Sequence, residues 1–259
     1  MPARPIRCIA ALLVAASLAA CAPSSLQRDA PDASVTTIPR ATDATACRPP
    51  PDVQQPQHVV GYGSLMQDES RMRTAPKAGP ASPVEVQGFR RGWFARVDAV
   101  GFSTTYLGVH ADAQSRLNAV VYAVDADELA ATDRREASYC RIAVTPGAIR
   151  ALQASGQPPI GQVWIYVSKP ESAAAPSAKF PIVQSYVDIF ISGCLEQEQR
   201  FALSGFARQC VTSTQGWSEH WVNDRIHPRR PFIHQPKARQ IDTLLSHELP
   251  DTFARIRIE

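Results

Sequence analysis

Several features that would assign this chain to a common class are missing from its sequence. After residue 20, no stretch reaches the roughly eighteen consecutive apolar residues that a membrane-spanning helix needs. No two cysteines have C-x-x-C spacing, which argues against thioredoxin chemistry and against a cysteine zinc site. A strong charge of one sign is missing too, because 27 basic residues stand against 24 acidic ones. This balance gives no electrostatic reason to expect nucleic acid as a partner.

Residues 1–20 have the features of a secretory signal. Arg4 and Arg7 precede an apolar stretch, Ile9 to Ala20, that is too short to span a bilayer and ends in small residues. The segment Leu18-Ala19-Ala20-Cys21 resembles a bacterial lipobox, which implies lipidation of Cys21. Ala22 follows the cysteine, and the absence of Asp at this position resembles lipoproteins that are sent to the outer membrane. We therefore expect a lipid-anchored cell-envelope protein facing the periplasm, with an ordinary signal and an unmodified Cys21 as the alternative.

The segment that follows is predicted to be a tether, residues 21–57. It has seven prolines after residue 22, no glycine and few large apolar side chains. A segment of this composition cannot bury enough surface to offset the entropy lost on ordering. Residues 58–259 remain and have the size of one ordinary domain, with a C-terminal extension expected from about residue 206.

Four cysteines remain once the one in the leader and the presumed lipid site are set aside. An even number in an oxidising compartment indicates up to two disulfides. We favour the local pairing of Cys194 with Cys210, which leaves Cys47 for Cys140. The alternative is that Cys140, in an apolar strand, is a buried free thiol.

Strands cluster before the main helices in the predicted secondary structure. Apolar or alternating runs predict strands over 58–62, 84–96, 104–110, 117–124, 139–144 and 162–167, with a polar turn at 111–115. Helices are expected over 126–136, 148–154, 181–194, 195–206 and 238–245, with Asp125 capping the first and a break near Gly193 or Gly205. This order favours an α+β fold over a doubly wound parallel sheet.

A glycine-rich loop follows the first predicted strand. It has the sequence Gly61-Tyr62-Gly63-Ser64-Leu65, whose backbone N–H groups suit a carboxylate or a developing oxyanion. It is not a dinucleotide fingerprint, because Met66 stands where the third glycine would be, and no Lys-Ser/Thr follows as in a P-loop. Ser64 also lacks the Gly-x-Ser-x-Gly setting of an α/β-hydrolase nucleophile.

The Tyr62–Leu65 loop is followed about seventy residues later by Arg135-Glu136. This order and spacing resembles the γ-glutamylcyclotransferase-like (AIG2-like) family, and Val86–Arg91 is similar, less sharply, to the second strand of that family. The resemblance implies a small mixed β-barrel flanked by helices. It also implies intramolecular acyl transfer on small γ-glutamyl compounds, releasing 5-oxoproline and an amine or amino acid without a cofactor.

The same resemblance implies site residues. Tyr62, Gly63, Ser64 and Leu65 are expected to bind the glutamyl group, and Glu136 to move the proton from the attacking amine to the leaving nitrogen. Burial would raise the pKa of Glu136, while Arg134 and Arg135 are expected to point elsewhere on the helix.

Other candidates surround this set. Tyr139 is predicted to line the pocket and Arg230, or its neighbour Arg229, to close it, with a polar strap that holds the C-terminal helix as the alternative. The C-terminal histidines lack a completing ligand set, so no metal is expected. Two alternatives stay open: Glu136 as a surface helix charge, and a non-catalytic lipoprotein that binds a small amino-acid-like ligand in the same pocket.

Overall fold

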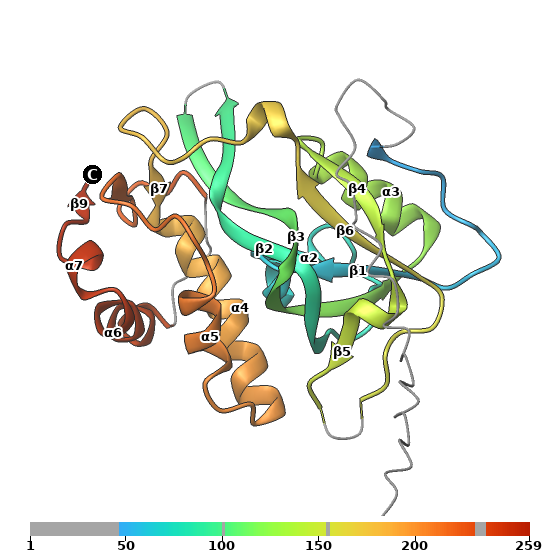
Figure 1. Cartoon of the computed structure of the whole chain (residues 1–259). Coiled ribbons are helices and arrows are strands. Elements are labelled where there is room, and N and C mark those ends of the chain that lie inside the picture. Colours follow the sequence, from blue (N-terminus) through green and yellow to red (C-terminus); the bar gives the residue numbers. More distant parts are fainter. Residues whose placement is uncertain (1–46, 100–101, 154–155, 231–236) are drawn as a thin grey trace, which may run out of the picture. The chain divides into compact units, whose positions relative to one another are not determined.

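Figure 1 shows the computed structural model, which describes residues 47–99, 102–153, 156–230 and 237–259. The predicted leader, Cys21 and most of the tether lie outside these residues, so lipidation stays a prediction. No helix in the described part of the chain is both long and apolar enough to cross a membrane.

The main sheet has six strands in the order β4-β6-β1-β3-β2-β5. Its strands are β1 (Gln57–Gly61), β2 (Ser82–Ala99), β3 (Phe102–Val124), β4 (Tyr139–Val144), β5 (Ile149–Ala151) and β6 (Gln162–Ser168). The sheet is mixed, because β1 runs parallel to β6 and antiparallel to β3. The long strands β2 and β3 curl, so that the sheet forms a half-barrel (Figure 1). The prediction of an α+β fold with a small mixed barrel flanked by helices is confirmed.

Strand β1 lies in the middle of this sheet, with β6 on one side and β3 on the other. Val59 and Val60 are completely buried, which fits the continuous apolar run seen in the sequence. The glycine-rich loop therefore leaves the sheet from its centre, and its first residue, Tyr62, is still buried.

The predicted turn at residues 111–115 is wrong, because β3 continues through it as one strand. The pairing with β2 jumps from Gln87↔Arg116 to Phe89↔Ala111, so residues 112–115 lie opposite a single residue of β2. Asp112 accepts hydrogen bonds from the Gln114 backbone and the Ser115 hydroxyl. The polar pattern therefore marks a bulge within a hairpin, and not a reversal of the chain.

Helices and a small parallel sheet complete the fold. The helices are α2 (Asp68–Met72), α3 (Ala126–Arg135), α4 (Gln184–Phe201), α5 (Phe206–Thr212), α6 (Ala238–Glu248) and α7 (Pro250–Phe253), with short 3₁₀ turns η1 (Ser64–Met66), η2 (Pro146–Ala148) and η3 (Pro170–Ser172). The second sheet has three strands in the order β7 (Ile182–Val183), β8 (Trp221–Asn223) and β9 (Arg257–Ile258).

Asp125 and Glu128 form a reciprocal capping box at the start of α3, which confirms the predicted cap. The helix predicted at 148–154 is wrong, because Ile149–Ala151 pairs with β2 as strand β5.

Helix α4 passes through Gly193 without a break and ends at Ala202, where the backbone turns left-handed. The predicted break therefore falls beside Gly205, and not at Gly193. A Cβ at Gly193 would lie 2.5 Å from the backbone nitrogen of Gln67, so glycine lets α4 press against the segment after the Tyr62 loop. Strand β7 occupies the start of the predicted 181–194 helix, because Ile182 and Val183 pair with β8.

Both favoured disulfides are present: Cys47–Cys140 and Cys194–Cys210. The first fastens Cys47, in the predicted tether, to β4, so residues before 58 take part in the folded domain. Arg48 adds to this contact by donating a hydrogen bond to the carbonyl of Glu136 at 3.1 Å. The alternative of a free Cys140 is therefore wrong.

The Cys194–Cys210 bond joins α4 to α5 across a sequence separation of 16 residues. Replacing both cysteines with alanine should lower the free energy of unfolding by about 3 kcal/mol, because the unfolded chain loses a cross-link that closes a short loop. Urea unfolding followed by circular dichroism measures this change. An unchanged midpoint, or a free Cys194 in unreduced peptide maps, would contradict the assignment.

Candidate functional site

A narrow inner pocket lies where the loop after β1 meets the end of α3. It is lined by Val60, Tyr62, Gly63, Ser64, Leu65, Leu107, Glu136, Tyr139, Tyr166 and Tyr186. All four predicted loop residues, Glu136 and Tyr139 therefore come together. The pocket volume is ≈ 20 Å³, which is room for about one water molecule with the side chains as they stand. A larger ligand enters only if one of the lining side chains moves aside.

Glu136 ends helix α3, and its side chain is only 16% exposed. The expectation that Arg135 points elsewhere is wrong, because its Nε lies 3.2 Å from Glu136 Oε1. Burial nevertheless raises the pKa of Glu136, against the opposing charges of Arg135, Arg230 and Arg48. A carboxyl group whose pKa is moved toward neutrality can accept and return a proton.

Arg135 links Glu136 to the glycine-rich loop. Besides its ion pair with Glu136, its guanidinium donates to the Ser64 hydroxyl, to the carbonyl and hydroxyl of Ser70, and to the Thr74 hydroxyl, at 2.6–3.0 Å. With Nε facing Glu136, all of its donor nitrogens are used. Arg135 therefore fixes the position of the loop relative to the carboxylate.

The phenol groups of Tyr62 and Tyr139 shape the pocket. Tyr62 donates its hydroxyl proton to the carbonyl of Tyr166 at 2.6 Å, and Tyr139 donates to the carbonyl of Leu107 at 2.9 Å. Burial raises the pKa of both phenols well above the ordinary value, so both remain protonated at neutral pH. Their protons are committed to backbone carbonyls inside the protein.

Tyr186 was missed as a site residue, because its position on the apolar face of α4 predicts only core packing. Its hydroxyl lies 2.8 Å from where a Cβ would stand on Gly63, so a larger residue there would displace Tyr186 from its present position. Burial raises the pKa of Tyr186 to about 12, against smaller effects that include the Ser64 backbone. The hydroxyl is thus a protonated donor facing the loop.

Arg91 supports the loop from behind and is completely buried. Its guanidinium donates to the carbonyl of Tyr62 at 3.1 Å, and to both the carbonyl and the side-chain oxygen of Asn118. It also reaches the carbonyl of Cys210 and the hydroxyls of Ser213 and Thr214 on the segment after the disulfide. Burial lowers the pKa of Arg91 to about 9, which leaves it charged at neutral pH.

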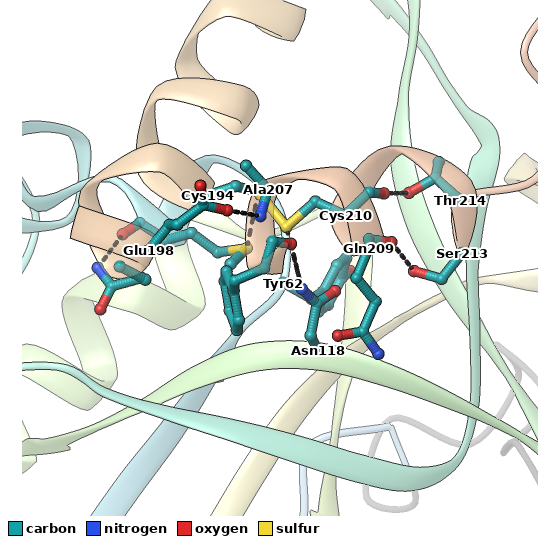
Figure 2. Close-up of a disulfide and its surroundings, with 12 residues drawn as sticks. Tyr62, Asn118, Cys194, Glu198, Ala207, Gln209, Cys210, Ser213 and Thr214 are labelled. Atoms are coloured by element: carbon teal, nitrogen blue, oxygen red, sulfur yellow. Dashed lines mark hydrogen bonds between the residues drawn. A yellow bond between two sulfur atoms is a disulfide. The ribbon is translucent and has the colours of Figure 1, made fainter. Parts of the chain in front are cut away.

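Figure 2 shows this arrangement around the Cys194–Cys210 disulfide. Asn118 lies under α5 next to Tyr62, and its amide donates to the carbonyl of Phe206 at 2.9 Å. Ser213 and Thr214 donate back to the carbonyls of Gln209 and Cys210. The C-terminal helices are thereby connected to the back of the glycine-rich loop.

An outer cleft of ≈ 290 Å³ is a second space, which shares no lining residue with the inner pocket. It is lined by Gln67, Ser70, Arg73, Thr74, Arg135, Ile189 and Arg230. Arg230, predicted to close the pocket, therefore lies in this cleft and not in the inner pocket. The two spaces are linked through Arg135, which bonds to Ser64 and Glu136 of the inner pocket. No group of three or more His, Cys, Asp or Glu side chains among the described residues is placed to hold a metal ion.

No protein-family model matches this sequence, and no curated protein matches it significantly. The chain is similar to solved γ-glutamyl cyclotransferases. One structure described as a γ-glutamyl cyclotransferase is 14% identical, covers 74% of this chain and 99% of its own, and has a TM-score of 0.46. A yeast γ-glutamyl cyclotransferase specific to glutathione is 11% identical, with coverages of 61% and 97% and a TM-score of 0.37. A mouse AIG2-like protein is 19% identical, with coverages of 45% and 82% and a TM-score of 0.32.

These are proteins of the kind that the two sequence motifs resemble. Similarity at such low identity and TM-score says nothing about activity. The activity has to be inferred from the chemistry of the pocket itself.

Replacing Arg91 with methionine should lower the free energy of unfolding by roughly 3 kcal/mol or more, because several buried acceptors lose their donor at about 1–3 kcal/mol each. Arg90→Met is the matched control. Arg90 is 40% exposed and its ion pair with Asp112 is 3.7 Å long, so its loss should cost less than about 1 kcal/mol. Equal urea midpoints for the two variants would contradict a supporting role for Arg91.

Proposed function

We propose that this chain catalyses the cyclisation of γ-glutamyl compounds to 5-oxoproline. The observation that carries the proposal is the placement of Glu136: a largely buried carboxylate, 16% exposed, with a raised pKa, lining the same narrow pocket as the Tyr62–Leu65 loop. A base of this kind next to backbone N–H groups suits an acyl transfer in which an amine attacks a carbonyl carbon.

In the proposed reaction, the α-amine of the glutamyl group attacks its own γ-carbonyl carbon. Glu136 takes a proton from the attacking nitrogen as the new C–N bond closes the five-membered ring. It then returns that proton to the nitrogen of the leaving amine as the old C–N bond breaks. Protons and bonds balance without a cofactor, and the carboxylate is regenerated.

The carbonyl oxygen gains negative charge when the ring closes. Ser64 and Tyr186 both line the inner pocket, and Tyr186 keeps its proton because its pKa is raised to about 12. We propose that the Ser64 N–H and the Tyr186 hydroxyl stabilise the oxyanion once Tyr186 moves aside to admit the substrate. Rotamer changes of this size are common when a ligand binds.

The same proposal places the protein at the bacterial cell envelope, anchored by lipid on Cys21. Two disulfides support an oxidising compartment. Acyl chains on one cysteine would hold the protein at the membrane, since each buried methylene contributes about 0.8 kcal/mol.

The anchor is tested by metabolic labelling with radioactive palmitate in a bacterial host. Cys21→Ser should abolish labelling and move the whole chain into the aqueous phase of a detergent partition. Cys8→Ser, in the leader, should leave both unchanged. Equal labelling of the two variants would refute lipidation at Cys21.

The activity is tested by incubating the whole chain with γ-glutamyl amino acids, γ-glutamyl amines and glutathione and assaying 5-oxoproline. Glu136→Gln should reduce kcat by about 10²–10⁴-fold, because it removes the general base. Asp127→Asn, an exposed carboxylate at the other end of α3, is the control and should keep full activity. Binding without product from the unmodified protein would favour a non-catalytic ligand-binding lipoprotein.

The pH profile of kcat/KM gives a second measure of Glu136. The base must be ionised, so the rate falls as pH drops through its pKa, and that acidic limb should lie above the ordinary glutamate value. Arg48→Gln removes a positive charge that lowers this pKa, so the limb should move to still higher pH. A limb that stays in place or moves to lower pH would exclude Glu136 as the titrating group.

A further inference from the structure

The outer cleft is lined by cationic side chains. Its lining includes Arg73, Arg135 and Arg230 but no carboxylate side chain, together with the polar groups of Gln67, Ser70 and Thr74 and the apolar Ile189. A cavity with several guanidinium groups, hydroxyls and one apolar wall suits a small molecule that carries an anionic group.

The three arginines differ in how far their guanidinium N–H donors are already used by other groups in the described part of the chain. Arg135 has used its donors on Glu136 and the loop, as described above. Arg73 is exposed and pairs with Glu69 at 2.5 Å. Arg230 has no carboxylate within ion-pair distance in the part of the chain that the structure describes, and is therefore the arginine of this cleft with donors to spare.

The backbone at Arg230 is held in place by α4. Its N–H donates to the Ser185 hydroxyl at 3.0 Å, and that hydroxyl donates in turn to Asp224 at 2.7 Å. Its guanidinium carbon lies 5.8 Å from the centre of the Tyr106 ring, which packs 4.6 Å from the ring of Tyr186. The cation is thus positioned beside the inner pocket, and its charge lowers the pKa of Glu136.

We propose that Arg230 binds a carboxylate carried by the leaving amine, so that the protein prefers γ-glutamyl amino acids and peptides to γ-glutamyl amines without a carboxylate. This inference rests on the proposed cyclisation. The glutamyl end, with its reacting amine and carbonyl, lies in the inner pocket against Glu136 and the backbone donors of the loop. The leaving amine then extends into the outer cleft, where its carboxylate meets Arg230 and its side chain meets Ile189.

The test compares γ-glutamylalanine with γ-glutamylethylamide, which differ only by the carboxylate of the leaving amine. For the whole chain, kcat/KM should be at least about tenfold higher for γ-glutamylalanine, since a hydrogen bond to a charged group contributes on the order of a tenfold effect or more. Arg230→Gln should reduce this preference by about tenfold or more. Arg230→Lys, which keeps the charge, should restore part of it.

Arg229→Gln is the matched control, because the neighbouring guanidinium turns away to the Ser103 carbonyl and the Glu259 carboxylate. It should leave the preference unchanged. If Arg230→Gln slows both substrates equally, Arg230 binds a group common to both, such as the glutamyl carboxylate, and the inference is wrong. If neither substrate is affected, the inference is wrong as well.

Failure of the proposed cyclisation is distinguished by a binding measurement that needs no turnover. Calorimetry with Glu136→Gln should give tighter binding of γ-glutamylalanine than of γ-glutamylethylamide, and adding Arg230→Gln should remove the difference. That result without any 5-oxoproline from the unmodified protein would retain the carboxylate site and reject the cyclisation. Equal binding of both compounds would reject the carboxylate site whatever the activity.

Discussion

The buried guanidinium of Arg91 connects the glycine-rich loop at the centre of the main sheet to the C-terminal helices. A charge with no exposed surface is tolerated only when its donors are satisfied, and here they bind the Tyr62 carbonyl, Asn118 and the segment after Cys210. The loop at the centre of the sheet and the C-terminal helices therefore share one cation. A shift of the loop or of the C-terminal helices would leave the Arg91 charge or several backbone carbonyls without partners.

A second arginine, Arg135, also fixes the position of the glycine-rich loop. Arg135 binds Ser64 and Glu136 together, so the carboxylate and the backbone donors keep a fixed relation. Its charge lowers the pKa of Glu136 while burial raises it, and burial is the larger effect. The pocket thus combines a rigid frame with a carboxyl group suited to proton transfer, which is the arrangement that preorganised catalysis requires.

Local sequence patterns predicted the elements that depend on local chemistry. The capping residue Asp125, the strand at Tyr139–Val144 and the short-range Cys194–Cys210 pairing were all foreseen, and Cys47–Cys140 followed as the remaining pair. Errors arose where a distant partner decides the outcome. The polar stretch at 111–115 stays in one strand because β2 pairs with β3 on both sides of it. Ile149–Ala151 is a strand because it forms backbone hydrogen bonds with β2.

The sequence by itself determined the glycine-rich loop, the candidate base and their order along the chain, because these are properties of residue type and spacing. Only the tertiary structure decided that Arg135 turns toward Glu136, that Tyr186 enters the pocket and that Arg230 lines the outer cleft. Side-chain direction at a helix end, and the approach of α4 and the C-terminal segment, depend on contacts between residues far apart in sequence. No local period or motif encodes such contacts.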